Sequence, residues 1–146
     1  DKHNLTPKPS KDEFFITMPF GEILKYEEQP IYFGFDEYGL STEAKKELEN
    51  LLLVMKQDPS VNLTISGNTD SRGSKEYNLY LSDKRANAAR NYLVKNGIGE
   101  DRIVIQGNGE GNLVNGCSDG VNCSNAQHAL NRRDEFKLFR KGDSSV

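Results

Sequence analysis

The stretch "VNLTISG", residues 61–67, restricts the fold of this chain more than any other feature. Its apolar side chains at positions 61, 63 and 65 alternate strictly with polar ones. This period of two predicts a β-strand with one buried face. An apolar strand face must be covered by another layer of structure. We therefore expect other elements of the chain to pack against this face.

The segments on either side of this strand have helical periodicity. Ser41 is a candidate N-cap, and the apolar positions that follow it are Ala44, Leu48, Leu51, Leu52 and Met55. The Asp58-Pro59 pair should end this first helix. Ser74 can cap a second helix, whose predicted apolar face carries Tyr77, Leu81, Ala88, Ala89 and Tyr92. Asn96-Gly97 supplies its C-terminal stop.

Three further strands complete the pattern. They are "IYFGF" at 31–35, "RIVIQG" at 102–107 and "DEFKLF" at 134–139. A long Gly-rich loop and a short helix around 124–131 precede the last strand. The order β-α-β-α-β-loop/short helix-β predicts an α+β fold, a two-layer α/β sandwich. We expect a mixed sheet of about four strands with the helices packed on one face.

The length of 146 residues fits one domain. Residues 1–12 resemble a linker or disordered tail, and 13–30 form an ambiguous N-terminal extension, either a short strand or a covering loop. The folded domain should span 31–146. No apolar run approaches the ~18–20 residues of a membrane span. Because the chain starts at Asp1, we expect any targeting or membrane-anchoring segment to lie outside it.

The composition argues against two classes of function. A net charge of −3 gives no reason to expect a nucleic-acid partner, which usually requires a clustered basic face. The chain has two histidines, and no serine or cysteine has an evident base partner, so we expect neither an enzyme nor a cofactor. An acid pair such as Asp36 and Asp70 could in principle cleave glycans, but nothing in the sequence separates their roles.

Arg85 is the one charge on the apolar face of the second helix. At about 100° per residue it falls roughly 40° from Leu81, inside the apolar stripe. A buried guanidinium is costly unless it is paired. One interpretation is a structural ion pair with Asp70 or another acid. The other is a receptor for a zwitterion, in which Asp70 accepts from an ammonium and Arg85 holds a carboxylate with two parallel donors.

The segment "GNTDSRGSKEYNLYLSDKRANAARNYLVKNGI" resembles the signature of the OmpA-like domain, a peptidoglycan-anchoring module. The family pattern is approximately G-H-T-D-x-x-G-x-x-x-Y-N-x-x-L-S-x-x-R-A. The matching positions are Gly67, Thr69, Asp70, Gly73, Tyr77, Asn78, Leu81, Ser82, Arg85 and Ala86. The resemblance continues in "IYFGFDEYGLSTEAKKELENL", in "GNGEG" and in "NRRDEF", and it covers about residues 31–140.

The resemblance implies a non-catalytic domain that binds the meso-diaminopimelate stem peptide of peptidoglycan on the periplasmic side of the outer membrane. Asp70 and Arg85 would hold the zwitterionic end of diaminopimelate. The other implied site residues are the wall residues Asn78, Leu81 and Ser82, the bordering Phe35 and Asp36 acting through backbone groups, and Arg132 and Arg133, for which a structural ion pair is an equal alternative. A second possibility is an interaction module of the same fold that contacts another envelope protein. Membrane association would come only from segments outside this chain.

Two positions depart from the family pattern. Asn68 stands where the family usually has histidine, and Asn108 stands where an aromatic residue is frequent. Both changes remove a ring near the expected site. They would weaken binding or adapt it to a different stem peptide, but they leave Asp70 and Arg85 in place.

Cys117 and Cys123 lie in the long loop, as either an oxidised pair or two thiols. This loop, with "SNAQHALNRR", resembles the version of the domain in outer-membrane proteins of the Bacteroidetes, which favours a Cys117–Cys123 disulfide. A metal site formed with His128 and Asp119 is the alternative. The C-x5-C-x4-H spacing lacks the usual knuckle, so we expect no metal and a local packing or capping role for His128.

Overall fold

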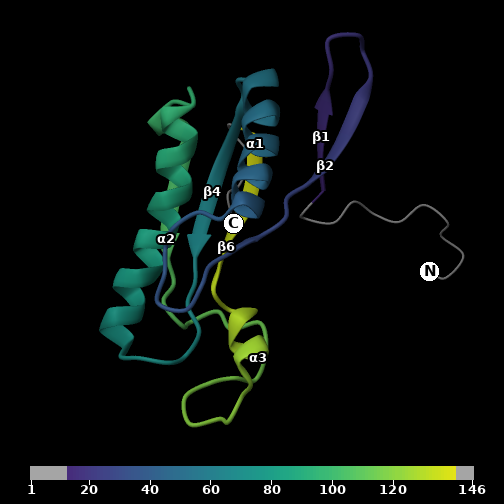
Figure 1. Ribbon diagram of the computed structural model, residues 1–146. Helices are drawn as coiled ribbons and strands as arrows, with labels where there is room; N and C mark the ends of the chain where they lie inside the picture. The colour runs from purple at the N-terminus through teal and green to yellow at the C-terminus, as the bar shows by residue number, and fades with distance from the viewer. Residues whose placement is uncertain (1–12, 141–146) are drawn as a thin grey trace, which may run out of the picture.

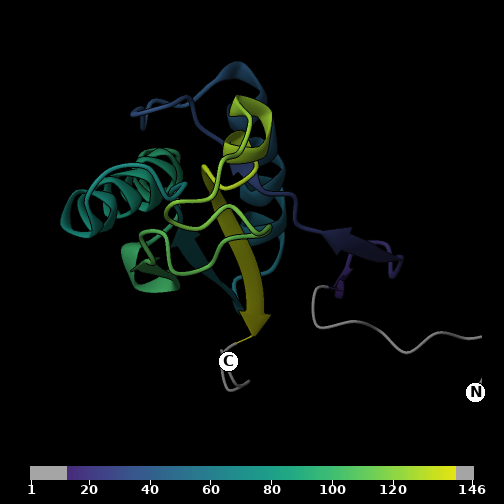
Figure 2. The ribbon, with the colours of Figure 1, turned by 90° about the horizontal axis from the view of Figure 1, so that it is seen from below.

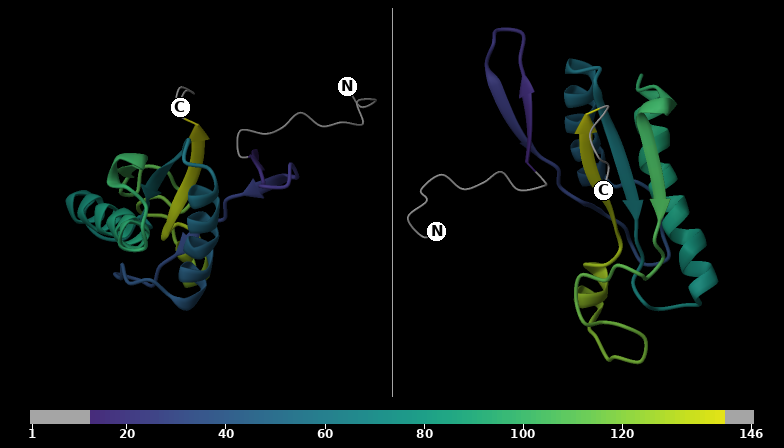
Figure 3. Two further views of the ribbon diagram at one scale, coloured as in Figure 1. Left: turned by 90° about the horizontal axis from the view of Figure 1, so that it is seen from above. Right: turned by 180° about the vertical axis from the view of Figure 1, so that it is seen from behind.

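The computed structural model describes residues 13–140 and shows a two-layer domain in which α1 and α2 cover one face of a sheet (Figures 1 and 3). The elements are β1 (Glu13–Thr17), β2 (Ile23–Glu27), β3 (Ile31–Tyr32), α1 (Thr42–Gln57), β4 (Val61–Gly67), α2 (Lys75–Lys95), the 3-10 turn η1 (Glu100–Arg102), β5 (Ile103–Gly107), α3 (Asn125–Ala129) and β6 (Arg133–Arg140). This confirms the predicted fold class. The tail expected at residues 1–12 lies outside the described residues.

The main sheet has four strands in the order β3-β6-β4-β5. β4 and β5 are parallel, whereas β6 runs antiparallel to both β3 and β4. The carboxyl ends of β4 and β5 therefore lie at the same edge as the start of β6. Gly67 at the end of β4 is opposite both Gly107 and Asp134, so three chain segments meet at this edge.

Both long helices begin where the sequence predicts. The Ser41 hydroxyl accepts from the Ala44 N–H at 3.0 Å, and the Ser74 hydroxyl accepts from the Tyr77 N–H at 3.1 Å. These caps satisfy donors that would otherwise have no partner in the first turn. All five predicted apolar positions of α1 are buried against the sheet. Within residues 13–140, no helix combines the length and apolar character needed to cross a bilayer.

The buried face of α2 differs from the prediction. Tyr77 is 41% exposed, and Ala88 and Tyr92 are only partly buried. The N-terminal half of α2 instead turns polar residues inward: Asn78, Ser82 and Arg85 are all buried. This half lies over the carboxyl ends of β4 and β5, where an added Cβ on Gly67 would lie 2.0 Å from the Ser82 carbonyl oxygen. The helix therefore packs by close backbone approach and polar contacts here, not by an apolar stripe.

The ambiguous N-terminal extension forms a β1–β2 hairpin, in which Phe14 and Ile16 are buried in the core. The strand expected over 31–35 is confirmed only at Ile31–Tyr32. Beyond it, a turn closes with a hydrogen bond from the Glu37 N–H to the Gly34 carbonyl, and Asp36 adopts φ 57°. The chain leaves the sheet at this turn, and the departure brings 34–37 beside α2.

The long loop after β5 is attached at several points at one end of the sheet, where Figure 2 shows it beside α3. A disulfide joins Cys117 to Cys123, as favoured from the sequence. The Ser71 hydroxyl donates to the Cys117 carbonyl oxygen at 2.6 Å. Ser124 and Gln127 form a capping box at the start of α3. The disulfide loop is thus tied directly to the segment that follows β4.

Replacing both cysteines, C117A/C123A, should lower the free energy of unfolding by about 2 kcal/mol, because a short loop is no longer closed in the unfolded chain. Urea denaturation of the variant and of the oxidised wild type measures this difference. Adding reductant should lower the wild-type stability by a similar amount and leave the variant unchanged. Equal stability of the oxidised and reduced wild type would contradict the prediction.

Candidate functional site

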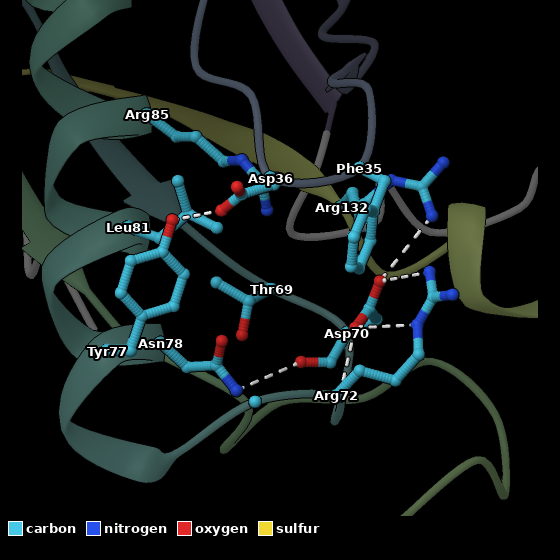
Figure 4. Close-up of a pocket in the computed structure, with 11 residues that line it drawn as sticks. Phe35, Asp36, Thr69, Asp70, Arg72, Tyr77, Asn78, Leu81, Arg85 and Arg132 are labelled. Atoms are coloured by element: carbon cyan, nitrogen blue, oxygen red, sulfur yellow. Dashed lines mark hydrogen bonds and ion pairs between the residues drawn. The ribbon is translucent and has the colours of Figure 1, made fainter.

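A cavity of about 340 Å³ opens between the first turns of α2 and the 34–37 turn, at the edge where β4 ends (Figure 4). Its walls come from four parts of the chain. The lining residues are Phe35, Asp36, Thr69, Asp70, Arg72, Gly73, Tyr77, Asn78, Leu81, Arg85 and Arg132. Seven of the nine residues that the sequence proposed for ligand binding lie among them.

Asp70 lines one side of the cavity and lies three residues after the end of β4. Its Oδ2 atom lies 2.9 Å from Arg72 Nη2 and 3.4 Å from Arg132 Nη1, and its Oδ1 atom accepts the Arg72 backbone N–H at 2.9 Å. Burial opposes ionisation of this carboxyl, but the hydrogen bonds from Arg72 outweigh it and hold the pKa of Asp70 below its usual value. Asp70 is therefore an anion with cationic partners on two sides.

Arg85 is fully buried, yet none of its hydrogen bonds goes to a carboxylate. Its guanidinium donates to the carbonyl oxygens of Glu37 at 2.8 Å, Asn68 at 2.9 Å and Gly34 at 3.1 Å. Burial lowers its pKa to about 10. Of the two interpretations of Arg85, a structural ion pair with Asp70 is therefore wrong, because the described residues contain no such pair. The sequence could not reveal this, because the acceptors are main-chain atoms.

Asp134 lies beside the Arg85 guanidinium at the start of β6 and was not singled out from the sequence. It is fully buried, and neither carboxylate oxygen has a hydrogen-bond partner among the described residues. Burial raises the pKa of this carboxyl well above its usual value, and the nearby charge of Arg85 only partly opposes the effect. A signal was available in "DEFKLF", where 134, 136 and 138 alternate on the buried face.

The opposite wall is formed by the start of α2 and the 34–37 turn. The Tyr77 hydroxyl donates to the Asp36 carboxylate across the cavity mouth, a bond that raises the Tyr77 pKa. Asn78 donates to the Asp70 carbonyl at 3.3 Å and to the Glu110 carboxylate at 3.1 Å. Phe35 and Asp36 border the cavity as predicted, but Asp36 also contributes its side chain.

Ser82 and Arg133 lie outside the cavity lining. The Ser82 hydroxyl accepts from the Gly109 N–H at 2.9 Å and so joins α2 to the loop after β5. Arg133 donates to the Asn112 carbonyl and to Glu135, on a different side of β6. Arg132 faces the cavity and also donates to the Phe33 carbonyl at 2.9 Å, a bond that holds the chain just after β3.

The sequence analysis did not assign Arg72, Gly73 or Thr69 to the ligand site, and it placed Tyr77 on the apolar face of the second helix. The Arg72 guanidinium lies 4.3 Å from the centre of the Phe35 ring, a cation–π contact. The Thr69 hydroxyl is buried against the cavity and has no partner among the described residues. Thr69 and Tyr77 match the family motif, but nothing in the local sequence indicates the direction in which Arg72 points.

The two departures from the family pattern contact each other. Asn108 Nδ2 donates to Asn68 Oδ1 at 3.2 Å, and Asn68 Nδ2 donates to the Ser66 carbonyl at 2.9 Å. Neither residue lines the cavity. This amide pair joins the ends of β4 and β5. The two departures from the family pattern therefore affect the strand ends next to the cavity, but not the residues that line it.

The chemistry of the lining fits binding better than catalysis. The cavity contains three arginines and two aspartates but no histidine, cysteine or serine. Glycan cleavage by an acid pair needs one carboxyl whose pKa is raised, and Asp70 does not fit that acid role because its pKa is lowered. The alternative metal site is also excluded for the thiols, because both sulfurs are in the disulfide. His128 is buried, and its Nδ1 atom has no hydrogen-bond partner among the described residues.

Comparisons with known proteins agree with this architecture. The chain is 37% identical over 109 residues to outer membrane porin F of Pseudomonas aeruginosa, covering 74% of this chain and 30% of that protein. It is 34% identical over 80 residues to the peptidoglycan-associated lipoprotein of Pasteurella multocida, covering 55% of this chain and 53% of that protein. The chain therefore spans about half or less of the length of these relatives.

Solved structures show the same arrangement. The crystal structure of the peptidoglycan-associated lipoprotein from Burkholderia pseudomallei superposes with a TM-score of 0.68 at 32% identity, covering 75% of this chain and 89% of that one. The C-terminal domain of Helicobacter pylori MotB shares the fold, with a TM-score of 0.66 at 16% identity, covering 78% and 87% of the two chains. The OmpA family model matches residues 32–127. The chain belongs to the OmpA family.

Proposed function

We propose that the domain binds the free, zwitterionic end of diaminopimelate in the stem peptide of peptidoglycan and thereby anchors an envelope protein to the cell wall. The observation that carries the proposal is one cavity lined by the Asp70 carboxylate and by guanidinium groups of Arg85 and Arg132. Relatives named peptidoglycan-associated lipoprotein support the wall as the partner.

The charges of the cavity suggest how each end of the zwitterion is held. Asp70 would accept from the ammonium. A guanidinium has five N–H donors, and three of those of Arg85 go to backbone carbonyls. The remaining two, with Arg132, can donate to a carboxylate in the cavity. The partnerless Thr69 hydroxyl supplies one further donor or acceptor beside them.

In the proposed role the domain holds an envelope protein at the cell wall and catalyses no reaction. Each domain would hold one stem peptide on the periplasmic side of the outer membrane. Many domains attached to one polymeric wall would be retained together without any new contact, because each bound copy raises the local concentration of the next stem peptide. This role requires no cofactor and no chemical step.

A protein-interaction role is the second candidate, and the exposed β1–β2 hairpin favours it. Phe20 at the turn is 98% exposed, and Ile23 and Leu24 beside it are also exposed. Apolar side chains at the end of a projecting hairpin are typical of contact surfaces. Under this alternative the hairpin, and not the cavity, would determine the partner.

Calorimetry with two stem peptides tests the proposal. The diaminopimelate peptide should bind, and the lysine peptide, which lacks the second carboxylate, should bind at least tenfold more weakly. D70N should lower affinity for the diaminopimelate peptide by about 10–100-fold, since a charge-assisted hydrogen bond contributes roughly 1.5–3 kcal/mol. D83N is the matched control, because Asp83 is exposed on α2 away from the cavity. Binding of neither peptide by folded wild-type protein would reject wall binding in favour of the interaction role.

A further inference from the structure

The carboxylate of Asp70 has no unused acceptor position in this structure. A carboxylate offers about four acceptor positions. Arg72 approaches Asp70 with its backbone N–H at 2.9 Å, its Nε at 3.4 Å and its Nη2 at 2.9 Å, while Arg132 Nη1 lies at 3.4 Å. A ligand ammonium therefore cannot simply be added to Asp70. It must replace one of these donors.

Arg72 is the donor that can leave. Its side chain is 34% exposed, whereas that of Arg132 is 13% exposed and is also fixed by a bond to the Phe33 carbonyl. Beyond Asp70, the Arg72 guanidinium has a 3.5 Å contact with Asn125 and lies against the Phe35 ring. These contacts would keep a displaced guanidinium at the cavity mouth, while the backbone N–H remains on Asp70.

We propose that Arg72 is a displaceable internal counter-ion of Asp70, and that this makes the cavity select ligands that carry an ammonium and a carboxylate together. The inference rests on the proposed function and names the residue that determines its specificity. Asp70 and Arg85 are the charges that hold the ligand, and Arg72 sets which ligands can reach them.

The selectivity follows from the exchange of partners. An ammonium that displaces Arg72 from Oδ2 breaks an existing ion pair and leaves a guanidinium without its anion. A ligand with only an ammonium offers Arg72 no new anion, so the loss of the Asp70–Arg72 ion pair weakens its binding. A zwitterion brings a carboxylate into the same cavity, where the released Arg72 regains an anionic partner. The cost of breaking the Asp70–Arg72 ion pair is therefore offset only for a ligand that carries both charges.

The test compares R72Q with wild type in calorimetric titrations with the diaminopimelate and lysine stem peptides. R72Q should bind the lysine peptide at least tenfold more tightly than wild type does, because Oδ2 of Asp70 is no longer occupied. Its affinity for the diaminopimelate peptide should stay level or fall. The ratio of the two affinities should therefore fall by tenfold or more. R90Q is the control, since Arg90 pairs with Glu100 away from the cavity.

Two results would overturn the inference. An unchanged affinity ratio in R72Q would show that Arg72 does not set selectivity, and an equal loss for both peptides would make Arg72 an ordinary wall contact. Either would leave the proposed function intact, provided that the wild type still binds the diaminopimelate peptide. Wild-type protein that binds neither peptide would reject the proposed function and the selectivity role together. Thermal melting of R72Q confirms that the variant is folded.

Discussion

Arg85→Ala is expected to destabilise the domain by about 3–5 kcal/mol as well as to abolish wall binding. The substitution removes the donor from the buried Asn68 carbonyl and from the partly buried Glu37 carbonyl, while the Gly34 carbonyl keeps the Glu37 N–H. The loss of a donor costs roughly 1–3 kcal/mol for a buried acceptor, and the deleted side chain leaves a cavity in addition. Since domains of this kind have free energies of unfolding of roughly 5–15 kcal/mol, much of the stability would be lost.

Urea denaturation measures this loss. Arg90→Ala is the control on the same helix, where Arg90 makes a partly exposed ion pair and should change stability by less than about 1 kcal/mol. Equal stability of R85A and wild type would show that the guanidinium acts on the ligand alone. Loss of wall retention in R85A would therefore not identify a ligand contact, whereas loss in D70N would, because Asp70 makes no comparable set of main-chain bonds.

Asp134→Asn is expected to remove a fall in stability with rising pH, because it replaces a buried carboxyl group that has no hydrogen-bond partner by an amide that does not titrate. The sign follows from the raised pKa of Asp134 in the folded state. Between the unfolded pKa, near pH 4, and the higher folded pKa, the native state holds a proton that the unfolded state has released. Wild-type stability therefore falls as pH rises through this range, and D134N lacks that fall.

Denaturation curves of wild type and D134N from pH 4 to pH 8 test the prediction. The two stabilities should be closest near pH 4 and should diverge as pH rises. Glu135→Gln is the matched control, since its carboxylate is the exposed neighbour of Asp134 on β6 and its removal should give no such divergence. Parallel curves for wild type and D134N would contradict the prediction. Asp70 contributes the opposite slope, but only below about pH 4, because its pKa is lowered.

The parts of the fold that depend on local signals could be predicted. The alternation in 61–67 located β4, and the serines at 41 and 74 located the starts of both long helices, because capping and periodicity are determined within a few residues. The strand over 31–35 was predicted too long. Gly34 and Phe35 have strand-like neighbours, but a turn held by α2 pulls them away from the sheet, and such a tertiary contact leaves no local trace.

The sequence predicted most residues that line the cavity, but not their hydrogen-bond partners. Wheel geometry placed Arg85 inside, and the family motif placed Asp70 beside the cavity. Their partners could not be derived, because main-chain carbonyls occur at every residue and only the folded chain determines which ones converge. Arg72 shows the same limit: it follows Asp70 by two residues, and its direction depends on Phe35 and Asn125 from distant segments.

The main-chain bonds of Arg85 have a consequence for mutational tolerance. A guanidinium that contacts backbone oxygens does not depend on the side chains of the residues it holds. Substitutions at Glu37, whose side chain is exposed, therefore leave the bond from Arg85 intact. The turn beside the cavity can vary in sequence while its backbone keeps its position. The rim of the candidate site can therefore vary in sequence while the backbone that supports it keeps its position.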